Sequence, residues 1–175
     1  MNPSTKPSWM PLSLEDNLNS GKQIAIALVE PRIPQNTGNI ARLCACTGAL
    51  LYLVGSLGFR LNDKYLARAG MDYLDDIPIH HIDTYEALEE KFSDWAFFFA
   101  STKAGQNYAT LAYPDKTVLV FGSETTGLPD WVIAEKPTQS IRIPMRANTR
   151  SLNLSNAVAI VLYEVIRQQL MTAAQ

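Results

Sequence analysis

The chain has 175 residues, of which 47% are hydrophobic and 18% are charged, and this composition suits a single domain with a sizeable core. Its formal net charge is −2, whereas proteins that hold nucleic acid by bulk electrostatics are usually basic, so only a local basic surface stays open for such a partner. No apolar run reaches the roughly 18 residues of a membrane helix, and the polar, proline-rich start lacks the apolar core of a signal peptide. We therefore expect a cytoplasmic protein with no membrane contact.

Residues 1–21 contain three prolines and show no periodicity, so we expect a flexible N-terminal extension before one domain at residues 22–175. That domain begins with Gln23–Glu30, a continuous apolar run typical of a strand covered on both faces. The segment of residues 39–49 follows, with a short helical pattern that ends at Gly48. The later predicted elements are strands at Ala49–Gly55, 77–82, Trp95–Ser101, Thr117–Ser123 and 140–144, and helices at Asp63–Ala69, 84–92 (with Asp83 as N-cap), 128–136 and Leu154–Leu170.

This alternation of strands and helices predicts an α/β domain with a mostly parallel sheet flanked by helices. Ligands of such sheets bind beyond the carboxyl ends of the strands. Four loops of small and polar residues follow predicted strands, with the sequences PRIPQNTGN, STKAG, GSETTG and MRANTRS. We expect these loops to converge on one edge of the sheet and to form a binding site there.

The two cysteines do not indicate a disulfide or a metal site. Cys44 and Cys46 are two residues apart, which on a helix directs them to different faces, so they should not pair with each other. Two cysteines and two histidines are too few for a convincing zinc site. We expect reduced, structural thiols and no bound metal.

The segment FGSETTGLP is a strand followed by a turn between two glycines. Gly122 and Gly127 allow another backbone or a ligand to approach closely. No phosphate-binding pattern is present, and the carboxylate of Glu124 disfavours an anionic ligand and suits a cationic or hydroxyl-rich one. A plain tight turn with Glu124 in solvent is the alternative.

Two further segments carry candidate functional side chains. In NTGNIAR, Asn36 or Thr37 can cap a helix, and Arg42 is flanked by apolar residues, which favours the edge of a site or interface over a plain surface position. The stretch from Met145 to Asn156 places amides, hydroxyls and two arginines directly before an apolar helix. One or two capping side chains would suffice there, so the surplus indicates a binding site.

The final helix is apolar almost all round. Its apolar stripe and the extension of that stripe consist of Leu154, Ala157, Val158, Ala159, Ile160, Val161, Leu162 and Val165. Such a helix is buried in its domain or in a subunit contact. In a chain of this length a subunit contact is credible, and we predict a homodimer.

Taken in order, residues 36–42, 121–129 and 143–156 resemble the three signature motifs of the SPOUT superfamily of RNA methyltransferases, and more narrowly its small tRNA 2'-O-methyltransferases that modify the wobble nucleotide. The resemblance covers nearly everything between residues 23 and 169. It implies a C-terminal trefoil knot, S-adenosylmethionine bound by the knot loops, a tRNA anticodon loop as substrate, and an active site completed by a second subunit. Methylation of another RNA, such as ribosomal RNA, and a non-catalytic RNA-binding module are the alternatives.

The resemblance also implies roles for individual residues. The positions that match the cofactor loops are Ala100, Ser101, Thr102, Gly122, Ser123, Glu124, Gly127, Ile143, Pro144, Met145, Ser151 and Leu152. Those that match the catalytic positions are Asn36, Arg42, Glu124, Ser151 and Asn153. Our candidates for RNA contacts are Arg60, Lys64, Arg68, Arg146 and Arg150. Two departures concern the second loop, where Ser123 stands in place of the common proline and Thr126 in place of the common arginine.

Overall fold

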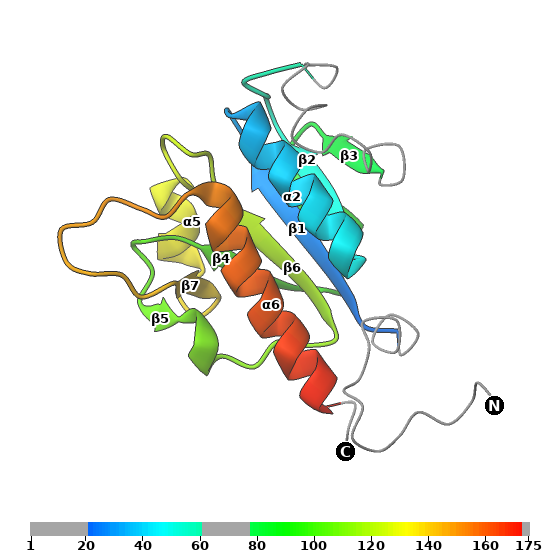
Figure 1. The fold of residues 1–175 in the computed structure, drawn as a ribbon, viewed down its shortest axis with the longest axis vertical. Helices are drawn as coiled ribbons and strands as arrows, with labels where there is room; N and C mark the ends of the chain where they lie inside the picture. Colours follow the sequence, from blue (N-terminus) through cyan, green and yellow to red (C-terminus); the bar gives the residue numbers. More distant parts are fainter. Residues whose placement is uncertain (1–20, 61–77, 173–175) are drawn as a thin grey trace.

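The computed structural model describes residues 21–60 and 78–172 (Figure 1). The predicted helix Asp63–Ala69 lies outside these residues, as does the predicted N-terminal extension except for its last residue. The division into an extension and a domain of residues 22–175 therefore stays a prediction. None of the described helices is long and apolar enough to span a membrane.

The described residues form one seven-stranded sheet in the order β3-β2-β1-β6-β4-β7-β5, and every strand pair is parallel. Its strands are β1 (Gln23–Val29), β2 (Leu50–Val54), β3 (Ile79–Ile82), β4 (Ala96–Ala100), β5 (Gln106–Asn107), β6 (Lys116–Phe121) and β7 (Ser140–Arg142). The prediction of an α/β fold with a mostly parallel sheet is confirmed. The two-residue strand β5 was not predicted, because so short a segment has no recognisable period.

Helices cover both faces of the sheet. They are α2 (Pro34–Thr47), α4 (Tyr85–Lys91), α5 (Asp130–Glu135), α6 (Leu154–Thr172) and the short 3₁₀ helix η1 (Tyr108–Thr110). Figure 1 shows α2 and α6 side by side in front of the sheet, and these two helices are in contact. Helices α4 and α5 contribute to the core on the opposite face.

Alternate residues of β1 belong to the two different cores. Ile24, Ile26 and Leu28 pack in the core that contains α2 and α6, whereas Ala25 and Ala27 pack in the core that contains α4 and α5. A strand that buries both of its faces needs apolar side chains at every position, which explains its continuous apolar run. The stripe on α6 is also confirmed, because Val158, Val161, Leu162 and Val165 are fully buried and Leu154 is partly buried.

The predicted helix caps are wrong at two helices. Helix α2 begins at Pro34, before the predicted start at residue 39, and its N-cap is Ile33, which makes no capping hydrogen bond with its side chain. Neither Asn36 nor Thr37 is the cap, since proline at the first position of a helix needs no N–H partner and allows the earlier start. Helix α4 is capped by Thr84 and not by Asp83, because the Thr84 hydroxyl accepts the Ala87 N–H at 3.2 Å.

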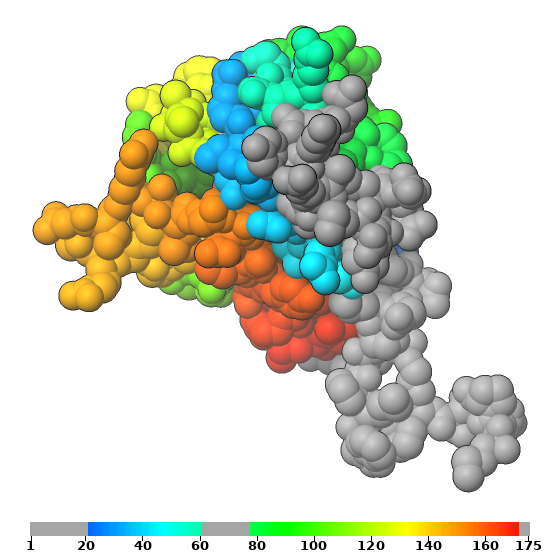
Figure 2. Space-filling view, turned by 45° about the horizontal axis from the view of Figure 1, so that its top comes forward, coloured from blue at the N-terminus to red at the C-terminus, as the bar shows by residue number. Residues whose placement is uncertain are grey.

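Other local predictions agree more closely. Gly48 ends α2 in the left-handed conformation, with φ of 72°. Both cysteines are free, with Cys44 buried and Cys46 exposed. Strand β7 ends at Arg142, so Ile143 and Pro144 belong to the following loop and not to the predicted strand 140–144. Figure 2 shows part of this loop, in orange, projecting from the body of the protein, and residues 146–153 are all exposed.

Candidate functional site

Strands β1, β6, β4 and β7 are consecutive neighbours in the sheet, so the segments that follow their carboxyl ends lie beside one another. Between these segments lies a cavity of about 570 Å³, which is lined from all four of them and from the start of α6. This is the size of an ordinary small-molecule site. The predicted convergence of the four polar loops on one edge of the sheet is confirmed.

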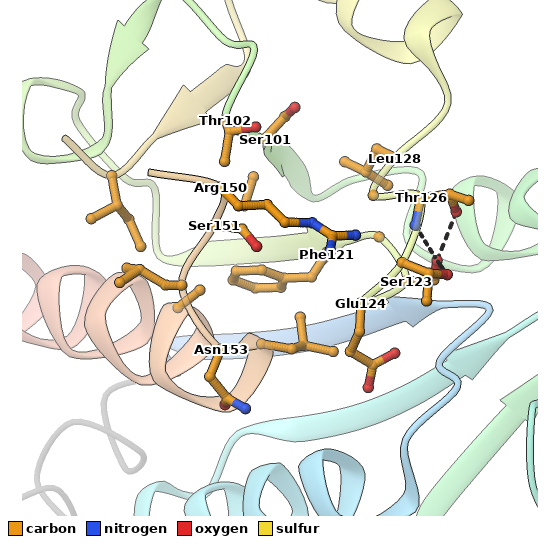
Figure 3. Close-up of a pocket in the computed structure, with 18 of the residues that line it drawn as sticks. Ser101, Thr102, Phe121, Ser123, Glu124, Thr126, Leu128, Arg150, Ser151 and Asn153 are labelled. Carbon is orange, nitrogen blue, oxygen red and sulfur yellow. Dashed lines mark hydrogen bonds between the residues drawn. The ribbon is translucent and has the colours of Figure 1, made fainter. Parts of the chain in front are cut away.

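The structure places most of the predicted site residues around this one cavity (Figure 3). Those on its wall are Asn36, Ala100, Ser101, Thr102, Gly122, Ser123, Glu124, Gly127, Ile143, Met145, Arg150, Ser151, Leu152 and Asn153. In Figure 3 the Arg150 side chain points across the cavity above Phe121. Arg150 therefore lies within the site, beside the predicted cofactor loops, although the sequence suggested only an RNA contact.

Some predicted site residues lie elsewhere. Pro144, Arg60 and Arg146 are described but do not line the cavity, and Lys64 and Arg68 lie outside the described residues. Arg42 is exposed on α2, also off the cavity wall. It follows Asn36 by six residues, or roughly 9 Å along the helix axis. Within one chain, the structure does not bring Arg42 to the residues that share its predicted catalytic role.

The loop after β6 is folded tightly on itself. The Gly127 N–H donates to the Ser123 carbonyl at 2.9 Å, and the Ser123 hydroxyl lies 2.7 Å from that of Thr126 and accepts the Thr126 N–H at 3.2 Å (Figure 3). A Cβ atom on Gly122 would stand 2.0 Å from the carbonyl carbon of Gly127, so only glycine fits there. The two residues that depart from the expected motif, Ser123 and Thr126, thus bond to each other and close the turn.

Glu124 is half-buried, and its carboxylate is not simply left in solvent. It accepts the backbone N–H of Arg32 at 2.9 Å, the backbone N–H of Ile33 at 3.2 Å and the Asn36 side-chain amide at 2.9 Å. These donors lie about 90 positions away in the chain, at the entry to α2. Glu124 therefore holds the loop after β6 against the segment after β1, and the solvent alternative is wrong.

A second contact extends this connection to α6. The Asn153 side-chain amide donates to Asn36 Oδ1 at 2.9 Å. The carbonyl oxygen of the same Asn153 side chain accepts the N–H groups of Ser155 at 2.9 Å and of Asn156 at 3.4 Å, so Asn153 caps α6. Glu124, Asn36 and Asn153 form one hydrogen-bonded chain across the three motif segments, which accounts for part of the polar surplus before α6.

Sequence reasoning missed the apolar floor and several rim residues of the cavity. The missed lining residues are Ile33, Lys103, Phe121, Thr125, Thr126, Leu128, Ile141, Leu154, Ala157 and Val161. Phe121 is the last residue of the buried strand β6, directly before a polar loop, and Ile141 is the buried middle residue of β7; these positions are the signal that could have found them. The site combines this apolar floor with a rim of hydroxyl groups from Ser101, Thr102 and Ser151.

Comparison with known proteins identifies relatives of this chain. The model of the SpoU rRNA methylase family matches residues 23–163. A tRNA (cytidine(34)-2'-O)-methyltransferase from Yersinia pestis is 46% identical over 149 residues, which is 82% of this chain and 92% of the relative. A solved structure that concerns the 2-OH methylation of C/U34 on tRNA is 35% identical, covers 87% of this chain and 99% of its own, and has a TM-score of 0.80. An AdoMet-bound rRNA methyltransferase from Sinorhizobium meliloti is 28% identical with a TM-score of 0.74, over 83% of this chain and 56% of its own.

Proposed function

This chain belongs to the SpoU rRNA methylase family, and we propose that it transfers a methyl group from S-adenosylmethionine to the 2'-hydroxyl of the wobble nucleotide, cytidine 34 or uridine 34, of tRNA. The observation that carries this proposal is the hydrogen-bonded chain Glu124–Asn36–Asn153, which joins the three motif segments around one cavity. The relative from Yersinia pestis bears the name of this activity and aligns with 82% of the chain.

The residues of the cavity fit S-adenosylmethionine. Its floor of Phe121, Leu128 and Ile141 offers an apolar surface to a planar base, and the hydroxyls of Ser101, Thr102 and Ser151 can bond the polar ends of such a ligand. The cavity volume of about 570 Å³ lies in the range of cofactor sites. The loop that carries Gly122 is closed by its own hydrogen bonds, which shape this part of the cavity wall.

When bound, S-adenosylmethionine supplies a methyl group on a positively charged sulfur that a hydroxyl oxygen can attack. Such an in-line displacement depends on alignment at about 3–3.5 Å, so the residues that hold the cavity wall in place supply much of the rate. We assign this positioning role to Glu124, Asn36 and Asn153, because their side chains are engaged with one another.

We propose that Arg42 orients the ribose hydroxyl or an adjacent phosphate and stabilises developing negative charge, because a guanidinium is a poor base. Since Arg42 lies off the cavity wall of its own chain, we propose that a second copy brings its Arg42 to this cavity. The partly exposed Ile160 and Tyr163 on α6, 37% and 49% exposed, give such a homodimer an apolar contact. Arg60, Arg146 and Arg150 would face the RNA.

Two further features belong to this proposal. The threading of the C-terminal segment into a trefoil knot is the arrangement that the family resemblance implies, with S-adenosylmethionine bound by the knot loops. A location in the cytoplasm would bring the enzyme together with its tRNA substrate, and the related tRNA methyltransferases are bacterial proteins.

The experiment that tests this function is methyl transfer from labelled S-adenosylmethionine to tRNA that lacks its own wobble 2'-O-methylation, with the product nucleoside mapped. Label at the ribose of nucleotide 34 is the expected result. Label on ribosomal RNA instead would reassign the substrate, and cofactor binding without any transfer would favour a non-catalytic RNA-binding module.

The shared active site has its own test. Arg42→Ala and Gly122→Ala should each be inactive, the first through loss of the arginine and the second through distortion of the cofactor loop. Mixing the two variants under conditions of subunit exchange should restore part of the activity, since one site of each mixed dimer then combines an intact cavity with an intact Arg42. No recovery in demonstrated mixed dimers would place Arg42 in the site of its own chain.

A further inference from the structure

Arg32 lies at the junction of β1 and α2, immediately outside the cavity. Its backbone N–H donates to Glu124 Oε2 at 2.9 Å, and its neighbour Ile33 is on the cavity wall. Arg32 itself does not line the cavity, and its side chain is 42% exposed. The backbone of this residue is therefore held at the rim of the site, while its guanidinium faces the surroundings.

Glu30 fixes the direction of this guanidinium. Its Oε2 accepts a hydrogen bond from Arg32 Nη2 at 2.7 Å. Glu30 is in the left-handed region with φ of 48°, a conformation that residues other than glycine rarely adopt and that concentrates at functional sites. Gly58 packs closely against Arg32: a Cβ on Gly58 would stand 2.7 Å from the Arg32 Cα, and the Gly58 N–H donates to the carbonyl of Pro31 at 2.9 Å.

Most of the donor capacity of Arg32 stays available after these contacts. A guanidinium carries five N–H groups, and Glu30 takes a single hydrogen bond, at Nη2. Nε and Nη1 bond to none of the residues that the structure describes. A planar fork with free donors and a restrained direction is suited to an anionic oxygen group such as a phosphate.

We propose that Arg32 binds a backbone phosphate of the substrate RNA close to the methylated ribose, with Glu30 as the residue that positions it. This inference rests on the proposed function, since it takes RNA as the substrate. Because the chain has a net charge of −2, its affinity for RNA depends on individual cations near the site and not on overall charge. RNA must approach the cavity from outside, which is where the Arg32 side chain lies.

The carboxylate of S-adenosylmethionine is the other anionic group that could reach this arginine. The cofactor is expected inside the cavity, and Arg32 is not among the residues that line it. From the same segment, Ile33 and Asn36 line the cavity. We therefore assign the guanidinium to the RNA. Measuring tRNA and cofactor affinities separately tells the two ligands apart.

The test is the salt dependence of tRNA binding by Arg32→Gln, measured on the full-length protein with S-adenosylmethionine and with tRNA titrated between about 50 and 200 mM salt. One lost phosphate contact lowers the slope of log Kd against log salt by about 0.7–0.9. We expect that decrease, about a three- to tenfold weaker tRNA affinity at low salt, and an unchanged cofactor Kd. Arg32→Lys should restore the slope but only part of the affinity, since it keeps the charge and loses the fork.

Lys116→Gln is the matched control. Lys116 pairs with Asp94 at 2.6 Å and is 46% exposed, close to the 42% of Arg32, but it lies at the amino end of β6, on the opposite edge of the sheet. Lys116→Gln should leave the slope of log Kd for tRNA against log salt unchanged. A wild-type slope in Arg32→Gln, or a loss confined to cofactor affinity, would overturn the inference. Wild-type protein that binds no tRNA would overturn the proposed function itself.

Discussion

Replacing Glu124 with glutamine tests whether its carboxylate joins the loop after β6 to the start of α2. Oε2 accepts the Arg32 N–H at 2.9 Å, whereas Oε1 accepts the Ile33 N–H at 3.2 Å and the Asn36 amide at 2.9 Å. A glutamine side chain has one acceptor oxygen. Its best orientation keeps the two bonds at Oε1 and turns an NH₂ group toward the Arg32 N–H, so that two donors face each other.

The size of the effect follows from these contacts. A hydrogen bond to a charged group contributes about 1.5–3 kcal/mol to stability. Because Arg32 is exposed and Glu124 only half-buried, water can solvate the released N–H, and we expect a loss of about 1–2 kcal/mol. For a domain of this size, that loss lowers the melting temperature by about 2–8 °C. The displaced loop should also weaken cofactor binding by about three- to tenfold, or about 0.7–1.4 kcal/mol.

Urea unfolding and calorimetric titration with S-adenosylmethionine measure the two effects. Glu90→Gln, which removes an exposed carboxylate on α4, is the matched control. A double-mutant cycle between Glu124→Gln and Asn36→Ala should give a coupling free energy above about 0.5 kcal/mol, since the two side chains are in contact. The reasoning fails if Glu124→Gln matches Glu90→Gln in both assays, or if its effect and that of Asn36→Ala are additive.

Three further predictions concern local structure. In the folded protein, a thiol reagent at neutral pH should modify Cys46 and not Cys44, because burial raises the pKa of the Cys44 thiol to about 12; rapid reaction of two thiols before unfolding would contradict this. Gly122→Ala should weaken cofactor binding by at least about tenfold, or about 1.4 kcal/mol. The control Gly105→Ala, whose Cβ would meet nothing within 4 Å, should keep the cofactor Kd of the wild-type protein. Thr84→Ala should cost about 1 kcal/mol in urea unfolding and Thr84→Ser much less, and equal losses would argue against the capping bond.

The sequence predicted the sheet well, for a physical reason. Strand β1 was expected at Gln23–Glu30 and lies at Gln23–Val29, and β2 was expected at Ala49–Gly55 and lies at Leu50–Val54. A parallel strand buried on both faces requires a continuous apolar run, and such a run is visible in the sequence alone. The same applies to α6, whose apolar residues recur at the period of a helix.

Predictions that depended on the partner of a polar side chain were less successful. Local rules made Asn36 or Thr37 a helix cap, but the amide of Asn36 bonds to Glu124, 88 positions away, and to Asn153, 117 positions away. A capping rule considers only the next few residues, so it cannot include such distant partners. Asn153, in contrast, does cap the helix directly after it, because its partners are local.

The sequence by itself determined the fold class, the order of the motifs and the four polar loops that form the site, since each depends on the period or composition of a short segment. Only the tertiary structure decided which loops are neighbours, because the insertion of β6 between β1 and β4 follows from long-range pairing. Tertiary structure also decided that Glu124 bonds to the entry of α2 and that Arg42 lies off the cavity of its own chain. Hydrogen bonds form between groups that folding brings together, and the spacing of residues along the chain does not specify those distances.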